Sequence, residues 1–138
     1  MAQKINPFPG LRPFEMQEKY LFFGREDQTV ELLKRLGQAR FMAVVGTSGS
    51  GKSSLVRAGL LPELHGGTMT DAGSSWEIAV MRPGGDPLTN LAKSLEDSGI
   101  YDTDEEGYYR HLRAMLGRST MGLIEAVSQS TLEKEDNL

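Results

Sequence analysis

The sequence contains no cysteine and only two histidines, His65 and His111. Without cysteine, the chain can form neither a disulfide nor a thiolate metal site. The two histidines are far apart in the sequence, and we expect both to be ordinary surface or core residues. No cluster of metal ligands is therefore predicted from these residue types.

Long apolar runs are also missing. No segment approaches the roughly 20 consecutive apolar residues that a helix needs to span a bilayer. Residues 1–7 contain no apolar stretch of the length found in signal peptides. We therefore expect a cytoplasmic location and no membrane partner.

Basic residues are scarce in the last third of the chain. The net charge is −4, and residues 95–138 contain 4 basic and 10 acidic side chains. Such a surface repels nucleic acid, so Arg110, His111 and Arg113 are expected on a solvated helix face and no nucleic-acid partner is predicted. At 138 residues and 38% hydrophobic content, the chain has the size of one globular domain or part of one.

Two apolar stretches have the character of buried strands. Phe41–Val45 is a short apolar run between charge and glycine, and residues 76–81 form a second candidate. Ahead of them, prolines in residues 6–14 predict an extended, turn-rich arm over residues 1–21. The order of strand and helix that follows predicts an α/β domain with a parallel sheet and flanking helices.

Five helices are predicted from apolar periodicity and end signals. The first covers residues 26–36 and is followed by Gly37, and the second runs from Lys52 and is ended by Pro62. Asp86 and Pro87 begin a third, which Gly99 closes. The remaining signals are a capping box of Thr103 and Glu106 ahead of a helix through Leu116, and Ser119 opening a last helix through Val127.

A glycine-rich loop lies between the first predicted strand and the second helix. It reads Gly46, Thr47, Ser48, Gly49, Ser50, Gly51, Lys52, Ser53, which matches the pattern GxxxxGK(S/T) of the phosphate-binding P-loop, or Walker A motif. Glycine at positions 49 and 51 would permit left-handed backbone angles and close approach of phosphate oxygens to backbone amides. The amides that open the helix would add their partial positive charge.

Three side chains after the glycines have distinct predicted roles. Lys52 would place its ammonium group on the β- and γ-phosphates and is the predicted catalytic residue. Ser53 would supply a hydroxyl oxygen to Mg²⁺, a cation that prefers hard oxygen ligands. Ser54 is expected to reach the α-phosphate.

The loop alone leaves other functions open. A small-molecule or nucleotide kinase is the main alternative, although kinases of the guanylate type place this loop nearer the N-terminus. A transporter ATPase would carry an LSGGQ-like sequence, which is missing here. A structural remnant that binds nothing is the third alternative, and the intact motif argues against it.

Further stretches of sequence carry a resemblance to a known family. The stretches are NPFPGLRPF at residues 6–14, FFGRE at 22–26, KSSLVRAGLLP at 52–62 and RPGGDPL at 82–88. Together they resemble the novel STAND NTPases of bacteria, which are AAA-like P-loop ATPases of signal transduction. The resemblance implies the N-terminal portion of an α/β P-loop NTPase fold, ATP or ADP as ligand, and a nucleotide-dependent switch in signalling or defence.

The resemblance also assigns residues ahead of the loop. It implies that Phe22, Phe23 and Gly24 shape the adenine pocket and that Arg25 lies near the nucleotide. Without the family, Arg25 would be read as a solvated residue at the start of a helix. Arg82, which follows the second predicted strand, is interpreted as structural.

Hydrolysis would need a further apolar strand ending in an acidic residue, known as Walker B. After residue 53 no apolar run is followed by a pair of acidic residues. The second predicted strand ends in Arg82, and Leu123, Ile124 and Glu125 have a helical pattern. Residues 22–138 are therefore interpreted as the N-terminal part of the domain, truncated before Walker B and not hydrolytic alone, with effector and sensor domains outside this chain. In the family's sheet both strands would lack their neighbours, so we expect marginal stability or self-association.

Overall fold

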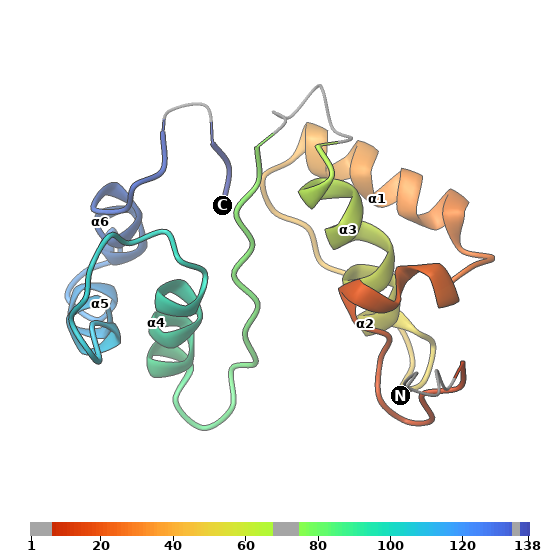
Figure 1. Cartoon of the computed structure of the whole chain (residues 1–138), viewed down its shortest axis with the longest axis horizontal. Coiled ribbons are helices and arrows are strands. Elements are labelled where there is room, and N and C mark those ends of the chain that lie inside the picture. The colour runs from red at the N-terminus through yellow and green to blue at the C-terminus, as the bar shows by residue number, and fades with distance from the viewer. Residues whose placement is uncertain (1–6, 68–74, 134–135) are drawn as a thin grey trace, which may run out of the picture. The chain divides into compact units, whose positions relative to one another are not determined.

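The computed structural model describes residues 7–67, 75–133 and 136–138. These residues form helices joined by loops, and the chain divides into two compact units, Met1–Ser74 and Ser75–Leu138 (Figure 1). We call them unit 1 and unit 2 and describe each by itself. Residues 1–6 of the predicted arm lie outside the described residues.

Among its described residues, unit 1 contains a 3-10 helix, an α-helix and one continuous helical run. The 3-10 helix η1 covers Met16–Leu21, and the α-helix α1 covers Glu26–Gln38. Then α2 (Lys52–Ser54), the π-helix η2 (Leu55–Leu60) and α3 (Leu61–His65) follow one another without a break. The acidic first turn and basic last turn of α1 match the helix dipole, and the predicted helix at residues 26–36 is confirmed with a slightly later end.

The helix that begins at Lys52 does not stop at Pro62, contrary to the prediction. Proline lacks an amide hydrogen and its ring collides with the carbonyl four residues earlier in a regular helix. Here the preceding segment is a π-helix, in which the Leu61 amide donates to the carbonyl of Val56. This wider turn leaves room for the proline ring, and the helix continues to His65.

Gly59 marks a close helix contact in unit 1. A Cβ at this position would lie 2.6 Å from Oγ1 of Thr29 on α1 and 3.6 Å from the ring of Phe22. Its neighbours are therefore Thr29 on α1 and Phe22 in the segment before α1. Glycine lets the two helices lie close together, and a larger residue would fit only if the Thr29 side chain moved.

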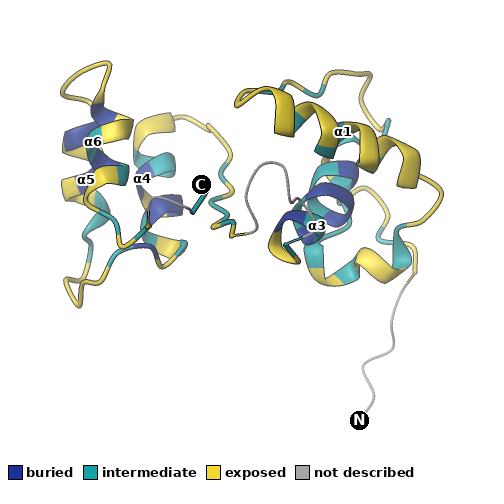
Figure 2. Cartoon of the chain, turned by 90° about the horizontal axis from the view of Figure 1, so that it is seen from above, coloured by how far each residue is buried: buried dark blue, intermediate teal, exposed yellow. Residues whose placement is uncertain are grey.

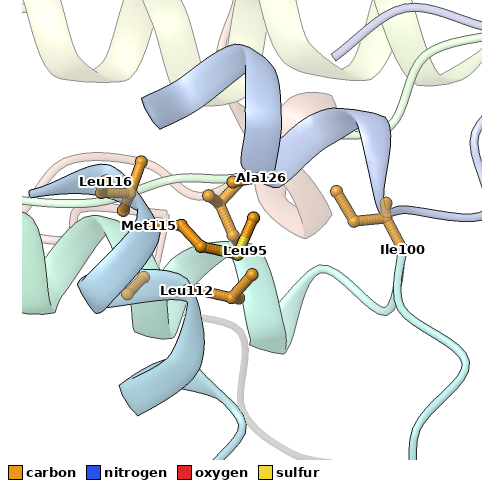
Figure 3. Packing of buried hydrophobic residues seen from close by; sticks show 7 residues of the cluster. Leu95, Ile100, Leu112, Met115, Leu116 and Ala126 are labelled. Atoms are coloured by element: carbon orange, nitrogen blue, oxygen red, sulfur yellow. The ribbon is translucent and has the colours of Figure 1, made fainter. Parts of the chain in front are cut away.

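Unit 2 is a cluster of three helices around one apolar core. The helices are α4 (Pro87–Asp97), α5 (Tyr109–Leu116) and α6 (Gly122–Ser128). Their buried side chains point toward one another in Figure 3, and Leu95 and Leu112 are 1% and 0% exposed. The other members of the core are Ala92, Ile100, Met115, Leu116 and Ala126.

The end signals of unit 2 are partly confirmed. The Asp86 carboxylate accepts the Thr89 amide at the start of α4, and Gly99 follows this helix with a left-handed φ of +78°. The capping box of Thr103 and Glu106 is wrong. The Thr103 hydroxyl accepts the Glu105 amide instead, and α5 begins only at Tyr109.

The predicted α/β fold with a parallel sheet is wrong for the described residues. They contain no strand, and the one sheet-like pairing among them is an isolated parallel bridge between Trp76 and Asn137. Phe41 and Val45 were expected to be buried on both faces of a sheet, yet they are 85% and 88% exposed. A segment becomes a strand only where a neighbour pairs with its amides and carbonyls, and no described segment pairs with residues 41–45.

Burial differs between the helices of unit 1. In Figure 2 the outer face of α1 is exposed, while buried positions lie on the helical run after Lys52 and on the helices of unit 2. Among the described residues, no helix is long and apolar enough to cross a membrane.

Candidate functional site

The glycine-rich loop at residues 46–53 has the backbone that its sequence predicts. Gly49 and Gly51 have φ angles of +76° and +82°, in the left-handed region that side chains disfavour. A Cβ at Gly46 would lie 3.1 Å from Oγ of Ser50, so this glycine also permits a tight turn. The loop therefore needs glycine at each of these positions for its shape.

The loop leads directly into the helix that begins at Lys52. The amide of Leu55 donates to the carbonyl of Gly51, which closes the first turn of the helix. The amides of Lys52 and Ser53 precede that hydrogen bond, and no acceptor in the described part of the chain pairs with them. Gly49 lies on the exposed surface with its amide equally without a protein acceptor. These amides can therefore bind an anion by donating hydrogen bonds to it.

The Lys52 side chain folds over the loop. Its Nζ donates to the carbonyl of Thr47 at 2.6 Å and lies 3.5 Å from Oγ of Ser50. The ammonium group is thus held above the turn by a neutral carbonyl. A phosphate oxygen would be a stronger partner for this charge than the carbonyl.

Arg25 lies against the same loop. Its Nη2 donates to the carbonyl of Ser50 at 3.3 Å, and its Nη1 donates to Oε1 of Gln28 at 2.9 Å. The structure therefore brings Arg25 and residues 46–53 together across a separation of 25 residues. The guanidinium adds a second positive charge beside the loop.

The residues around Arg25 form a tight turn into α1. Gly24 has a φ of +80°, and its amide donates to Oε1 of Glu26 at 2.9 Å. This hydrogen bond is the main reason that the pKa of Glu26 is lowered. Gly24 is therefore placed for a backbone turn.

The two phenylalanines of this segment differ in environment. The Phe22 ring lies 5.9 Å from that of Phe14 and packs against Gly59. Phe23 is 78% exposed. Phe22 therefore faces the helix that follows the loop, and Phe23 faces solvent. Of the segment ahead of the loop, the structure brings Arg25 against the loop but not Phe23.

The N-terminal arm contacts the helix after the loop, which sequence reasoning did not predict. The Phe14 amide donates to Oγ of Ser54 at 3.1 Å, and Glu15 pairs with Arg57 at 2.6 Å. No local pattern in the sequence shows which helix the arm contacts, because the contacting residues lie about 40 positions apart.

The remaining candidate residues carry no ligand-binding arrangement. Arg110, His111 and Arg113 are exposed as predicted for a solvated face, and Arg113 pairs with Asp86 at 3.7 Å. The carbonyl of Arg82 accepts a hydrogen bond from Asn90 ahead of α4. In the described ranges, no group of three or more acidic, histidine or cysteine side chains could hold a metal ion.

The profile named Novel STAND NTPase 1, which describes nucleoside triphosphatases, matches residues 7–136. The chain therefore belongs to the novel STAND NTPase 1 family, and the resemblance stated from the sequence is confirmed. Nucleotide is the ligand class that this family name implies. Searches of curated proteins and of solved structures gave no significant match.

Proposed function

We propose that residues 46–53 form a P-loop that binds the phosphate chain of ATP or ADP. The observation that carries the proposal is the left-handed backbone of Gly49 and Gly51, directly ahead of a helix, in a member of an NTPase family. These angles turn backbone amides toward one side of the loop, where phosphate oxygens can accept hydrogen bonds from them.

The side chains of the loop divide the work of binding. Lys52 exchanges its hydrogen bond to the Thr47 carbonyl for the β- and γ-phosphate oxygens and neutralises part of their negative charge. The Ser53 hydroxyl is exposed at the start of the helix, and this hard oxygen fits Mg²⁺. Mg²⁺, if held by Ser53, would offset part of the negative charge of the phosphates.

The segment ahead of the loop is proposed to contact the nucleoside. Arg25 already contacts the loop through Ser50, which supports a position next to the bound phosphates. Phe23 offers an exposed aromatic face, whereas Phe22 supports the turn from inside. Gly24 provides the turn that presents both neighbours.

The biological role that fits these features is a nucleotide-dependent switch in signal transduction or defence. The family membership supports signalling, and exchange of Lys52 between a carbonyl and a phosphate gives the loop two states. Hydrolysis is not part of the proposal for residues 7–136. Self-association stays a prediction, which sedimentation of the chain with and without ATP would test.

A displacement experiment tests the proposal. A fluorescent ATP analogue is bound to the chain with Mg²⁺ and displaced with ATP, ADP and GTP. Lys52→Ala is expected to weaken binding about 10- to 100-fold, since a hydrogen bond to a charged group contributes about 1.5–3 kcal/mol. Lys34→Ala on α1 removes the same charge and serves as the control. Equal affinity of Lys52→Ala and the unmodified chain would refute the proposal.

A further inference from the structure

A series of polar contacts joins the N-terminal arm to the helix that begins at Lys52, which we call the loop helix. Arg12 forms two hydrogen bonds with the Glu18 carboxylate, at 2.6 and 2.7 Å. The same carboxylate accepts the Glu15 amide at 3.0 Å. Glu15 in turn pairs with Arg57 at 2.6 Å, one helical turn beyond Ser54. We call residues 12–18 with Arg57 the arm latch.

The arm latch ends on a hydroxyl that the loop helix presents. Phe14 belongs to the arm latch, and its backbone amide donates to Oγ of Ser54 at 3.1 Å. Ser54 is half-buried, so its hydroxyl has limited contact with water. No other hydrogen bond to this hydroxyl is present in the described part of the chain.

The chemistry of a hydroxyl gives this contact a direction. A serine hydroxyl carries one donor hydrogen and two acceptor lone pairs. Because the Phe14 amide occupies a lone pair, the Ser54 hydrogen remains available for an acceptor elsewhere. The contact therefore orients Ser54 as a hydrogen-bond donor, and a phosphate oxygen is an acceptor without hydrogens of its own.

We propose that the arm latch positions Ser54 to donate to the phosphate nearest the nucleoside. This inference rests on the proposed function, because it assumes that residues 46–53 hold the outer phosphates. Glu15 and Arg57 act as positioning residues and do not touch the nucleotide. The arm is thus part of the nucleotide site, although it lies about 40 residues before Ser54 in the sequence.

A purely structural strap would explain the same contacts but predicts a different response. If the arm only stabilised the helix, its loss would lower affinity for every ligand of the loop alike. If it acts through Ser54, its loss affects a ligand that reaches the inner phosphate and spares a shorter one. Inorganic pyrophosphate with Mg²⁺ is such a shorter probe.

The test is a double-mutant cycle on binding affinity. Calorimetry measures Mg-ATP and Mg-pyrophosphate binding to the unmodified chain, Glu15→Gln, Ser54→Ala and the double variant. Glu15→Gln is expected to weaken ATP about 3- to 10-fold, corresponding to one oriented hydrogen bond, and to change pyrophosphate less than about twofold. In the Ser54→Ala background, Glu15→Gln should cause no further loss of ATP affinity.

The control is Glu31→Gln on α1. Glu31 pairs with Arg35 at the same 2.6 Å, and the change removes the same charge from a pair with no contact to Ser54. A double charge reversal, Glu15→Arg with Arg57→Glu, should restore ATP affinity if Glu15→Gln acts by breaking the ion pair. Circular dichroism confirms that each variant retains its helices.

The outcomes separate the two proposals. If the unmodified chain does not bind ATP through Lys52, the proposed function fails and this inference fails with it. If ATP binds through Lys52 but Glu15→Gln leaves its affinity unchanged, only the arm latch is refuted. Equal weakening of ATP and pyrophosphate, or an undiminished effect of Glu15→Gln in the Ser54→Ala background, likewise overturns it.

Discussion

The two units of this chain bury their apolar side chains in different ways. In unit 2 the core is shared by three helices, and Leu95 and Leu112 are almost completely buried. In unit 1 the buried apolar side chains Leu55, Ala58, Leu60 and Leu64 all come from the helical run after the loop. The run Phe41–Val45 lines an open groove of about 580 Å³ with the end of α1. Unit 2 thus closes its core, while unit 1 carries the candidate site beside uncovered apolar surface.

Local sequence patterns therefore predicted the helices of unit 2 but not the conformation of residues 41–45 in unit 1. Each helix of unit 2 satisfies its backbone hydrogen bonds within itself, so periodicity and caps decide its formation. The strand predicted at residues 41–45 depends on a partner that no local pattern supplies.

Truncation of the unit 2 core should have the largest effect on stability. Leu112→Ala is expected to lower the free energy of unfolding by about 2–5 kcal/mol, because the cavity has no solvent to fill it. Phe41→Ala in unit 1 should change stability by no more than about 0.5 kcal/mol, since that ring is already 85% exposed. Urea denaturation followed by Trp76, the only tryptophan, reports unit 2, and circular dichroism reports both units. A loss below about 1 kcal/mol for Leu112→Ala would contradict the packed core.

Replacing a glycine by alanine should have the next largest effect on stability, and the effect should differ between the two units. At Gly122 a Cβ would collide with the backbone of Met115 and Leu116, which cannot move cheaply. We expect Gly122→Ala to destabilise unit 2 by about 1–3 kcal/mol in the same denaturation assay.

The matching change in unit 1 is Gly59→Ala, which should cost less. Its obstacle is the end of the Thr29 side chain, 2.6 Å from the added Cβ, and this side chain can rotate. Thr29→Ala should remove most of the remaining cost in the double variant. If Gly59→Ala proves the more harmful change, the helix packing described for unit 1 is wrong.

Acid should weaken the start of α4 through Asp86. Hydrogen bonds from the Thr89 hydroxyl and amide, with the charge of Arg113, hold the pKa of Asp86 below its ordinary 3.8. Because the folded pKa is the lower one, this stabilisation is complete above pH 3.8 and is lost as the pH falls through the folded pKa. Asp86→Ala should remove that part of the acid dependence, measured by Trp76 fluorescence between neutral and acid pH. An identical acid profile for the variant would exclude the cap as its cause.

The smallest effect belongs to the arm of unit 1. Hydrogen bonds from Arg12 and from the Glu15 amide lower the pKa of Glu18 from 4.5 to about 2. The stabilisation is complete above pH 4.5 and is lost as the pH falls toward 2, and it is small because the pair is exposed to solvent. NMR titration of the Glu18 carboxyl carbon should show this pKa, and Arg12→Gln should raise it toward 4.5. A midpoint near 4.5 in the unmodified chain would show that the ion pair does not form.

The sequence predicted the local features of the candidate site better than its surroundings. Glycines at 49 and 51 need left-handed angles whatever lies around them, and Asp86 with Pro87 begins a helix by itself. The arm contacts on Ser54 and Arg57 could not be predicted, because they join segments about 40 residues apart. The predicted end of the helix at Pro62 was wrong because the π-helix before it leaves room for the proline ring.

The most direct measurement is an NMR titration of the backbone amides with Mg-ATP. We expect the amide resonances of Gly49, Gly51, Lys52 and Ser53 to shift together and saturate with one binding constant, and Lys52→Ala to need about 10- to 100-fold more Mg-ATP for the same shifts. Loop amides that do not shift at saturating Mg-ATP, or that shift with the same binding constant in Lys52→Ala, would contradict this site.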